Sequence, residues 1–128
     1  MTNSDPSRVV TDFQMAKLAQ AIEHLRTFDK EIPAQVIATF LYVASHDDCS
    51  KVDLEKALAF STASGSRNTD WLSDFHRLNK AGLGLITKTR DPSNRRKQIL
   101  KLSPKGRILV QQLKNILYAN SNLESNLG

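Results

Sequence analysis

The chain has 128 residues, of which 40% are hydrophobic and 24% charged, and its formal net charge is +5. This length suits a single domain with its own hydrophobic core, and this composition excludes a disordered chain. The only cysteine, Cys49, excludes an internal disulfide. Residues 1–11 hold no apolar signal segment, and the longest apolar stretch, Val36–Ala44, is too short to span a bilayer. We therefore expect a single-domain cytoplasmic protein that has no membrane segment.

Apolar residues at three- and four-residue steps predict two helices in the first third of the chain. The first spans about Val9–Asp29, and the second begins near Pro33 and ends near His46. The second has the broad apolar face expected of a central core helix. The apolar positions of the first are Met15, Leu18, Ile22 and Leu25, and those of the second are Val36, Ile37, Phe40, Leu41 and Ala44.

Two further helices are predicted in the middle of the chain. Ser50 is a plausible N-cap for a short third helix that places Leu54, Ala57 and Leu58 on one side. The polar residues 61–66, with one glycine, predict a turn. A fourth helix then runs to about Ala81, where Gly82 or Gly84 ends it. The predicted buried side of this fourth helix consists of Trp71, Phe75 and Leu78.

A hairpin and a last helix complete the predicted order of elements. Residues 85–90 and 98–102 are short runs with β-branched residues, separated by the turn sequence Asp91-Pro92-Ser93-Asn94. Ser103 and Pro104 predict a cap and a first helical turn before a helix over about 105–119. The fold class is therefore mainly α with a small β-hairpin wing, a winged helix-turn-helix. The apolar positions of the last helix are Ile108, Leu109, Leu113, Ile116 and Leu117.

Positive charge is concentrated in one segment. Between Arg77 and Arg107 there are ten basic residues and a single acid, Asp91, so the segment carries +9 and the rest of the chain −4. A basic block on a mildly acidic body is typical of a protein that contacts a phosphate backbone. The basic residues that we expect to contact double-stranded DNA from this segment are Arg77, Lys88, Arg90, Arg95, Arg96 and Lys97.

The fourth helix has side chains suited to the DNA major groove. If Trp71, Phe75 and Leu78 face inward, the polar residues near its start are expected to be exposed. Arginine and asparagine make bidentate contacts to guanine and adenine, so base contacts are predicted here. A shifted helix start, which places Ser73, Asp74 and Arg77 in the groove, is the alternative. The residues predicted to contact bases are Ser66, Arg67, Asn68 and Thr69.

The stretch from Leu78 to Gly106, LNKAGLGLITKTRDPSNRRKQILKLSPKG, resembles the winged-helix segment of MarR-type regulators over about a quarter of the chain. Shared features are a leucine and a Gly-Leu pair at the end of the recognition helix, a wing tip like D-P-x-x-R-R, and an exit of leucine, serine or threonine, two residues and glycine. PadR-like regulators and phage replication or repressor proteins share the pattern.

The resemblance implies a homodimeric, bacterial or phage transcription regulator whose terminal helices, residues 9–30 and 105–119, form the dimer around a DNA-binding core at 33–103. It also implies that Arg96 is the wing arginine, with Asp91 as its partner and Arg95 beside it. The apolar stripes of both terminal helices favour the same dimer. A small-molecule effector is compatible with such a regulator, but no residue pattern identifies one.

Other functions are not favoured by the residues. His46, Asp47, Asp48 and Cys49 lie together but have no distant partner, which favours a turn over a metal site. No Ser-His-Asp or Cys-His spacing indicates a nucleophile, so neither an enzyme nor a cofactor is expected. Two alternatives stay open: a DNA-binding replication or packaging accessory protein without operator specificity, and a winged-helix adaptor whose basic wing docks an acidic protein partner.

Overall fold

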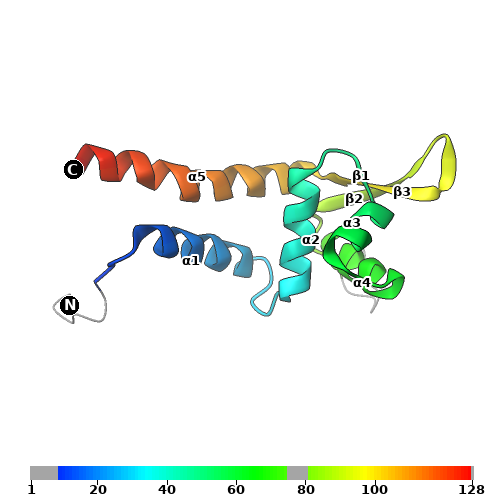
Figure 1. Ribbon diagram of the computed structural model, residues 1–128, viewed down its shortest axis with the longest axis horizontal. Helices are drawn as coiled ribbons and strands as arrows, with labels where there is room; N and C mark the ends of the chain where they lie inside the picture. Colours follow the sequence, from blue (N-terminus) through cyan, green and yellow to red (C-terminus); the bar gives the residue numbers. More distant parts are fainter. Residues whose placement is uncertain (1–8, 75–80, 128) are drawn as a thin grey trace.

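The computed structural model describes residues 9–74 and 81–127, with side chains described up to residue 118. It contains an arm and a winged body (Figure 1). None of the helices in these ranges is long and apolar enough to cross a membrane. In chain order the elements are α1 (Phe13–Arg26), α2 (Ala34–Ser45), β1 (Cys49–Ser50), α3 (Lys51–Leu58), α4 (Thr62–Leu72), β2 (Ile86–Asp91), β3 (Asn94–Leu102) and α5 (Pro104–Leu127).

The helix starts can be compared with the capping residues predicted from the sequence. Ser50 caps α3 by accepting a hydrogen bond from the backbone N–H of Asp53 at 3.0 Å. Ser103 accepts from the N–H of Gly106 at 3.0 Å, with Pro104 as the first residue of α5. These predicted caps are confirmed. α1 begins at Phe13 rather than at Val9, because Asp12 caps it by accepting from the N–H of Met15 at 3.1 Å.

The sheet is antiparallel, with strand order β1-β3-β2. The predicted hairpin is confirmed, but β3 begins at Asn94 rather than at residue 98, so the two strands extend to the tip. The strand β1 was not predicted, because two residues, Cys49 and Ser50, carry no periodic signal. They pair with Leu100 and Ile99 of β3.

The core of the body surrounds α2, as the sequence predicts. Val36 and Phe40 of α2 are fully buried, together with Leu54 of α3, Leu72 of α4 and Leu100 of β3. Leu41, which the sequence placed on the same apolar face, is 46% exposed instead. The core thus joins α2, both short helices and the sheet into one body.

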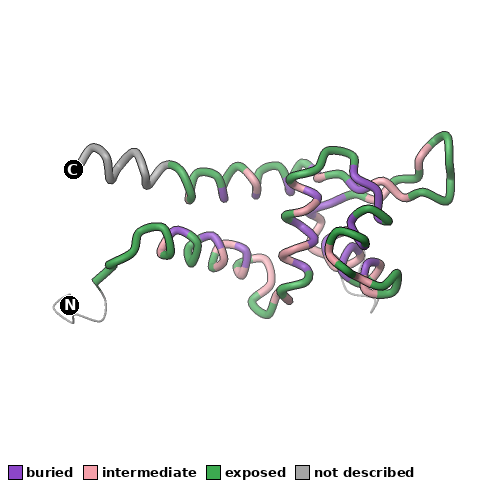
Figure 2. Tube along the Cα trace, viewed as in Figure 1, coloured by how far each residue is buried: buried purple, intermediate pink, exposed green. Residues whose placement is uncertain are grey.

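The arm consists of α1 packed along α5, and both helices extend away from the body (Figure 1). Leu25 of α1 and Leu109 and Leu113 of α5 are buried, and Figure 2 shows the buried residues on the sides where the two helices face each other. His24 and Gln112 join the helices through a hydrogen bond of 2.7 Å between Nε2 and Oε1.

α3 and α4 approach each other closely at Gly65. A Cβ atom there would lie 2.6 Å from Cγ of Glu55 and closer still to its carboxylate. Glu55 cannot retreat easily, because its side chain is only 10% exposed and forms an ion pair with Lys51. Lys51 also donates to the carbonyl oxygen of Thr62 at 3.4 Å, so the pair holds the start of α4.

Gly65→Ala is therefore expected to destabilise the protein by about 1–3 kcal/mol through overpacking. This sign is opposite to the usual gain of about 1 kcal/mol for alanine over glycine inside a helix. Urea unfolding of the variant measures the difference. Ser66→Ala, on the neighbouring half-exposed position, is the control and should change the free energy of unfolding by less than about 0.5 kcal/mol. A Gly65→Ala protein as stable as the wild type would contradict the close approach.

Candidate nucleic-acid interface

α4 has an inward and an outward face. Ser61 caps the helix by accepting from the N–H of Ser64 at 3.1 Å. The inward face is formed by four buried residues at helical spacing: Gly65, Asn68, Thr69 and Leu72. The outward face consists of the exposed Thr62, Ala63 and Arg67 and the half-buried Ser66 and Asp70.

Two expectations about this helix are wrong. The predicted turn over residues 61–66 is helical from Thr62 onward, because Ser61 supplies the cap and Gly65 is required by helix packing rather than by a turn. The predicted helix end near Ala81 is also wrong: α4 ends at Leu72 with Ser73 as its C-cap. Gly84, which adopts a positive φ of 67°, lies well beyond this end.

The earlier start rotates two predicted base-contacting residues into the protein. Asn68 is 4% exposed and donates to Oε1 of Gln35 on α2 at 3.1 Å. Thr69 is fully buried and its hydroxyl donates to the carbonyl oxygen of Gly65 at 2.8 Å. Their predicted exposure is therefore wrong, and neither side chain can reach a base edge. Arg67 is exposed as predicted, and its Nη2 donates to Oγ of Ser64 at 3.1 Å.

The alternative prediction, a shifted helix start with Ser73, Asp74 and Arg77 in the groove, falls only partly on described residues. Ser73 caps the C-terminal end of α4, with its hydroxyl donating to the carbonyl oxygen of Asp70 at 3.0 Å, and Asp74 is exposed. Arg77, together with Phe75 and Leu78 of the predicted buried side, lies outside the described residues. Trp71 is half-buried and packs against the core, as predicted, although Leu72 is the more deeply buried neighbour.

Lys88 joins the wing to α4 instead of pointing freely outward. Its ammonium group forms an ion pair with Asp70, and the two side chains are only 18% and 24% exposed. A lysine held in this way has its charge largely compensated, so we assign it a structural position between β2 and α4. The pair fixes the wing beside the outward face of α4.

The remaining predicted wing residues are exposed, and all of them lie near the hairpin tip. Arg90 donates from Nη1 to the carbonyl oxygen of Arg95 at 2.9 Å, which leaves its side chain lying across the hairpin. Arg95, Arg96 and Lys97 follow one another on the outgoing strand β3. The tip therefore presents dense positive charge on a narrow ribbon.

Asp91 orders the tip through Ser93 and not through Arg96. Its Oδ1 accepts from the N–H and the hydroxyl of Ser93 at 2.9 and 2.7 Å. These hydrogen bonds, with the nearby charge of Lys97, lower the pKa of Asp91. No ion pair joins Asp91 to Arg96 within the described part of the chain, so the expected partnership is wrong. The backbone N–H of Arg96 instead donates to Oδ1 of Asn94 at 3.2 Å, which leaves the guanidinium unengaged by the turn.

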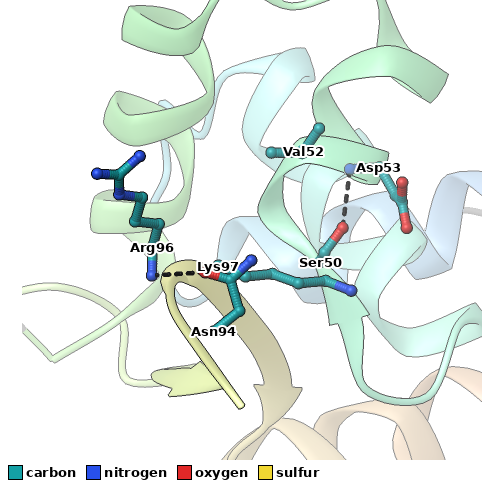
Figure 3. A pocket seen from close by; sticks show the side chains of 6 residues that line it. All are labelled: Ser50, Val52, Asp53, Asn94, Arg96 and Lys97. Atoms are coloured by element: carbon teal, nitrogen blue, oxygen red, sulfur yellow. Dashed lines mark hydrogen bonds between the residues drawn. The ribbon is translucent and has the colours of Figure 1, made fainter. Parts of the chain in front are cut away.

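A shallow cleft lies between the wing and the start of α3 (Figure 3). It has a volume of about 320 Å³, and its sides are formed by β3 and α3. The figure shows the Lys97 side chain running toward Ser50, while the guanidinium of Arg96 points away from the α3 residues. The residues that line the cleft are Ser50, Val52, Asp53, Asn94, Arg96 and Lys97.

Cys49 has no feature of a reactive thiol. It is buried in β1, and burial is the largest cause that raises its pKa, followed by the charges of Asp53 and Asp48. Desolvation thus raises the pKa of Cys49 more than the nearby carboxylates do. Among the described residues, no group of three or more His, Cys, Asp or Glu side chains is arranged to hold a metal ion.

The sequence analysis missed four residues at the start of α4. Thr62 and Ala63 belong to the exposed face of this helix, and Lys51 and Glu55 hold its first turn, but none of the four was singled out. A usable signal was present: Ser61 is a good N-cap that directly follows Phe60, which packs against the core. Gly65 concealed the signal, because glycine is usually interpreted as a turn residue.

No protein-family model matches the sequence, and no curated protein is significantly similar to it. Solved structures do share its fold. S. aureus MepR in complex with DNA is 22% identical with a TM-score of 0.66, and the alignment covers 88% of each chain. The transcriptional regulator Tm0710 from Thermotoga maritima is 19% identical with a TM-score of 0.67 over 89% of this chain and 74% of its own. A mutant MarR from E. coli complexed with operator DNA is 19% identical with a TM-score of 0.60 over 88% of this chain and 73% of its own. The chain therefore has the winged-helix fold of MarR-type regulators.

Proposed function

We propose that the protein is a homodimeric transcription regulator that binds double-stranded DNA sequence-specifically, with α4 in the major groove and the wing on the adjacent minor groove. The observation that carries the proposal is the placement of α4 and the arginine-rich wing at the same end of the molecule, opposite the free end of the arm (Figure 1). The shared fold with two regulators solved on DNA supports it.

The outward face of α4 has the size and chemistry for a major groove. An α-helix fits this groove, and arginine is the commonest side chain to contact guanine. Arg67 is the one arginine among the described residues of α4, and Thr62, Ala63 and Ser66 beside it are small. Small neighbours let the helix approach the bases closely, so we assign base contact to Arg67 and close approach to the others.

The wing is suited to the backbone and the minor groove. Guanidinium groups are attracted to the negative potential of a narrow minor groove, and basic side chains along its edge neutralise phosphates. Arg90, Arg95, Arg96 and Lys97 are exposed on a ribbon held next to α4 by the Lys88–Asp70 pair.

The arm provides a surface for a second copy. Phe13, Met15 and Leu18 of α1 and Ile108 and Tyr118 of α5 are each at least half exposed. Exposed apolar side chains in this number on two adjacent helices favour an interface over a solvated surface. A two-fold dimer through the arm would present two copies of α4, as an inverted-repeat operator requires.

The dimer can be tested by light scattering, which should give about twice the chain mass of 14.3 kDa. Leu18→Glu, on the exposed face of α1, should yield a monomer, because an unpaired carboxylate in an apolar interface is unfavourable. Val52→Glu is the matched control, since Val52 and Leu18 are both 50% exposed but Val52 lies on α3. A wild-type monomer at tens of micromolar, or a dimeric Leu18→Glu protein, would contradict this interface.

Replacing Arg95 and Arg96 together by alanine should weaken binding to every duplex by a similar factor. The slope of log K against log salt should flatten by roughly one to two units per chain, because fewer counterions are released. Lys30→Ala with Lys114→Ala is the control: it removes the same charge from two exposed positions outside the wing, one in the loop between α1 and α2 and one on α5. If the control weakens binding equally, net charge and not the wing is responsible.

Arg67→Ala should lower affinity for a site selected from random duplex by about 1–3 kcal/mol and leave affinity for random duplex nearly unchanged. Competition binding on the two DNAs measures both. If the preference for the selected site survives Arg67→Ala but is lost in Arg77→Ala, the shifted helix start, with Arg77 in the groove, would be the correct one. A protein that binds all duplexes equally would be an accessory protein, and one with no DNA affinity at low salt would be an adaptor.

A further inference from the structure

The last turn of α4 is tied to the loop between α1 and α2. The indole Nε1 of Trp71 donates to Oδ2 of Asp29 at 2.9 Å, across 42 positions of the sequence. The other carboxylate oxygen of Asp29 accepts from the backbone N–H of Glu31 at 3.0 Å, which holds the carboxylate in place. A hydrogen bond to a charged acceptor is stronger and more directional than one between neutral groups.

A second set of contacts connects Trp71 to Phe28, the residue before Asp29. The backbone N–H of Leu83 donates to the carbonyl oxygen of Trp71 at 2.9 Å. The ammonium of Lys105, in the first turn of α5, donates to the carbonyl oxygen of Leu83 at 2.9 Å and lies 5.5 Å from the ring centroid of Phe28. Phe28 directly precedes Asp29. We call these five residues the junction: Phe28, Asp29, Trp71, Leu83 and Lys105.

The junction is where the arm meets the end of α4. Phe28 and Asp29 follow α1, Lys105 begins α5, and Trp71 lies in the last turn of α4. If the arm joins two copies, the orientation of α4 relative to the arm sets how far apart the two α4 helices stand. Adding one base pair between the two half-sites moves them about 3.4 Å further apart and rotates one relative to the other by about a tenth of a helical turn. A small rotation at the junction therefore decides which spacing fits.

We propose that Asp29 and Trp71 are a positioning pair that fixes α4 relative to the dimer arm and so selects the half-site spacing of the operator. The assignment rests on the proposed function. Neither residue touches DNA: both act through the orientation of α4. Apolar packing of Trp71 against the core would persist without Asp29, whereas the hydrogen bond from its indole N–H to the loop between α1 and α2 would be lost.

The test uses full-length protein and a site selected with the wild type from random duplex. Affinity is measured for that site and for versions whose half-sites are moved together or apart by one base pair. The wild type should discriminate against the altered spacings about tenfold or more, and Asp29→Ala and Trp71→Phe should each reduce this to about twofold. The double variant should be no worse than either single one, because both remove the same bond.

Two variants separate positioning from general stability. Asp29→Asn keeps an oxygen that can accept from the indole, so it should restore most of the discrimination lost in Asp29→Ala. Glu31→Ala, an exposed acid in the same loop, should behave as wild type. If Asp29→Ala does not fold, Trp71→Phe, which retains an aromatic ring, provides the test. Its affinities for the altered half-site spacings are then compared with those of the wild type.

The outcomes distinguish the two proposals. A wild-type protein that binds no duplex overturns the proposed function, and the positioning role falls with it. A wild type that binds sequence-specifically, with folded variants that keep its full spacing preference, overturns only the positioning role. A wild type indifferent to spacing also overturns that role, because nothing would then be selected.

Discussion

The close approach of α3 and α4 at Gly65 is the constraint on which the rest of the body depends. With no side chain at this position, α4 lies directly on Glu55, and the ion pair between Glu55 and Lys51 is enclosed between the two helices. Enclosing two charges is unfavourable unless they are paired and hydrogen-bonded, so this contact tolerates little sliding or rotation. The same lysine reaches the carbonyl oxygen of Thr62, and the first turn of α4 is therefore fixed along with its middle.

Beyond this contact, three side-chain contacts hold α4 against the rest of the body. Asn68 is bound to Gln35 on α2, Asp70 to Lys88 on β2, and Trp71 to Asp29 before α2. Each of these bonds is directional, and together they leave little freedom for the helix to roll. A helix used for recognition benefits from this, because base contacts lose value if the helix must be ordered during binding.

The wing is held to the body less completely than α4. Its root is fixed by pairing with β1 and by Lys88, while its tip is ordered only locally, by Asp91 with Ser93 and by Asn94 with Arg96. Positive charge is concentrated on the part that is least tied to the body. Phosphate contacts depend on charge more than on direction, so a ribbon of this kind can follow the backbone while α4 stays rigid. In the proposed DNA complex, the wing would therefore supply affinity and α4 specificity.

The order of the helices and of the two hairpin strands was predictable from the sequence, as were the caps at Ser50 and Ser103-Pro104, the central role of α2 and the basic hairpin. These features depend on periodicity and on residues within a few positions of one another. The start of α4, the inward position of Asn68 and Thr69, the pairing of Lys88 and the strand β1 were decided by the tertiary structure. A polar side chain faces inward when a distant residue satisfies it, as Gln35 does for Asn68, and a glycine is placed inside a helix when a neighbouring helix leaves no room for a Cβ atom. Both conditions exist only after the chain has folded, because the partners lie 33 positions apart in one case and on a separate helix in the other.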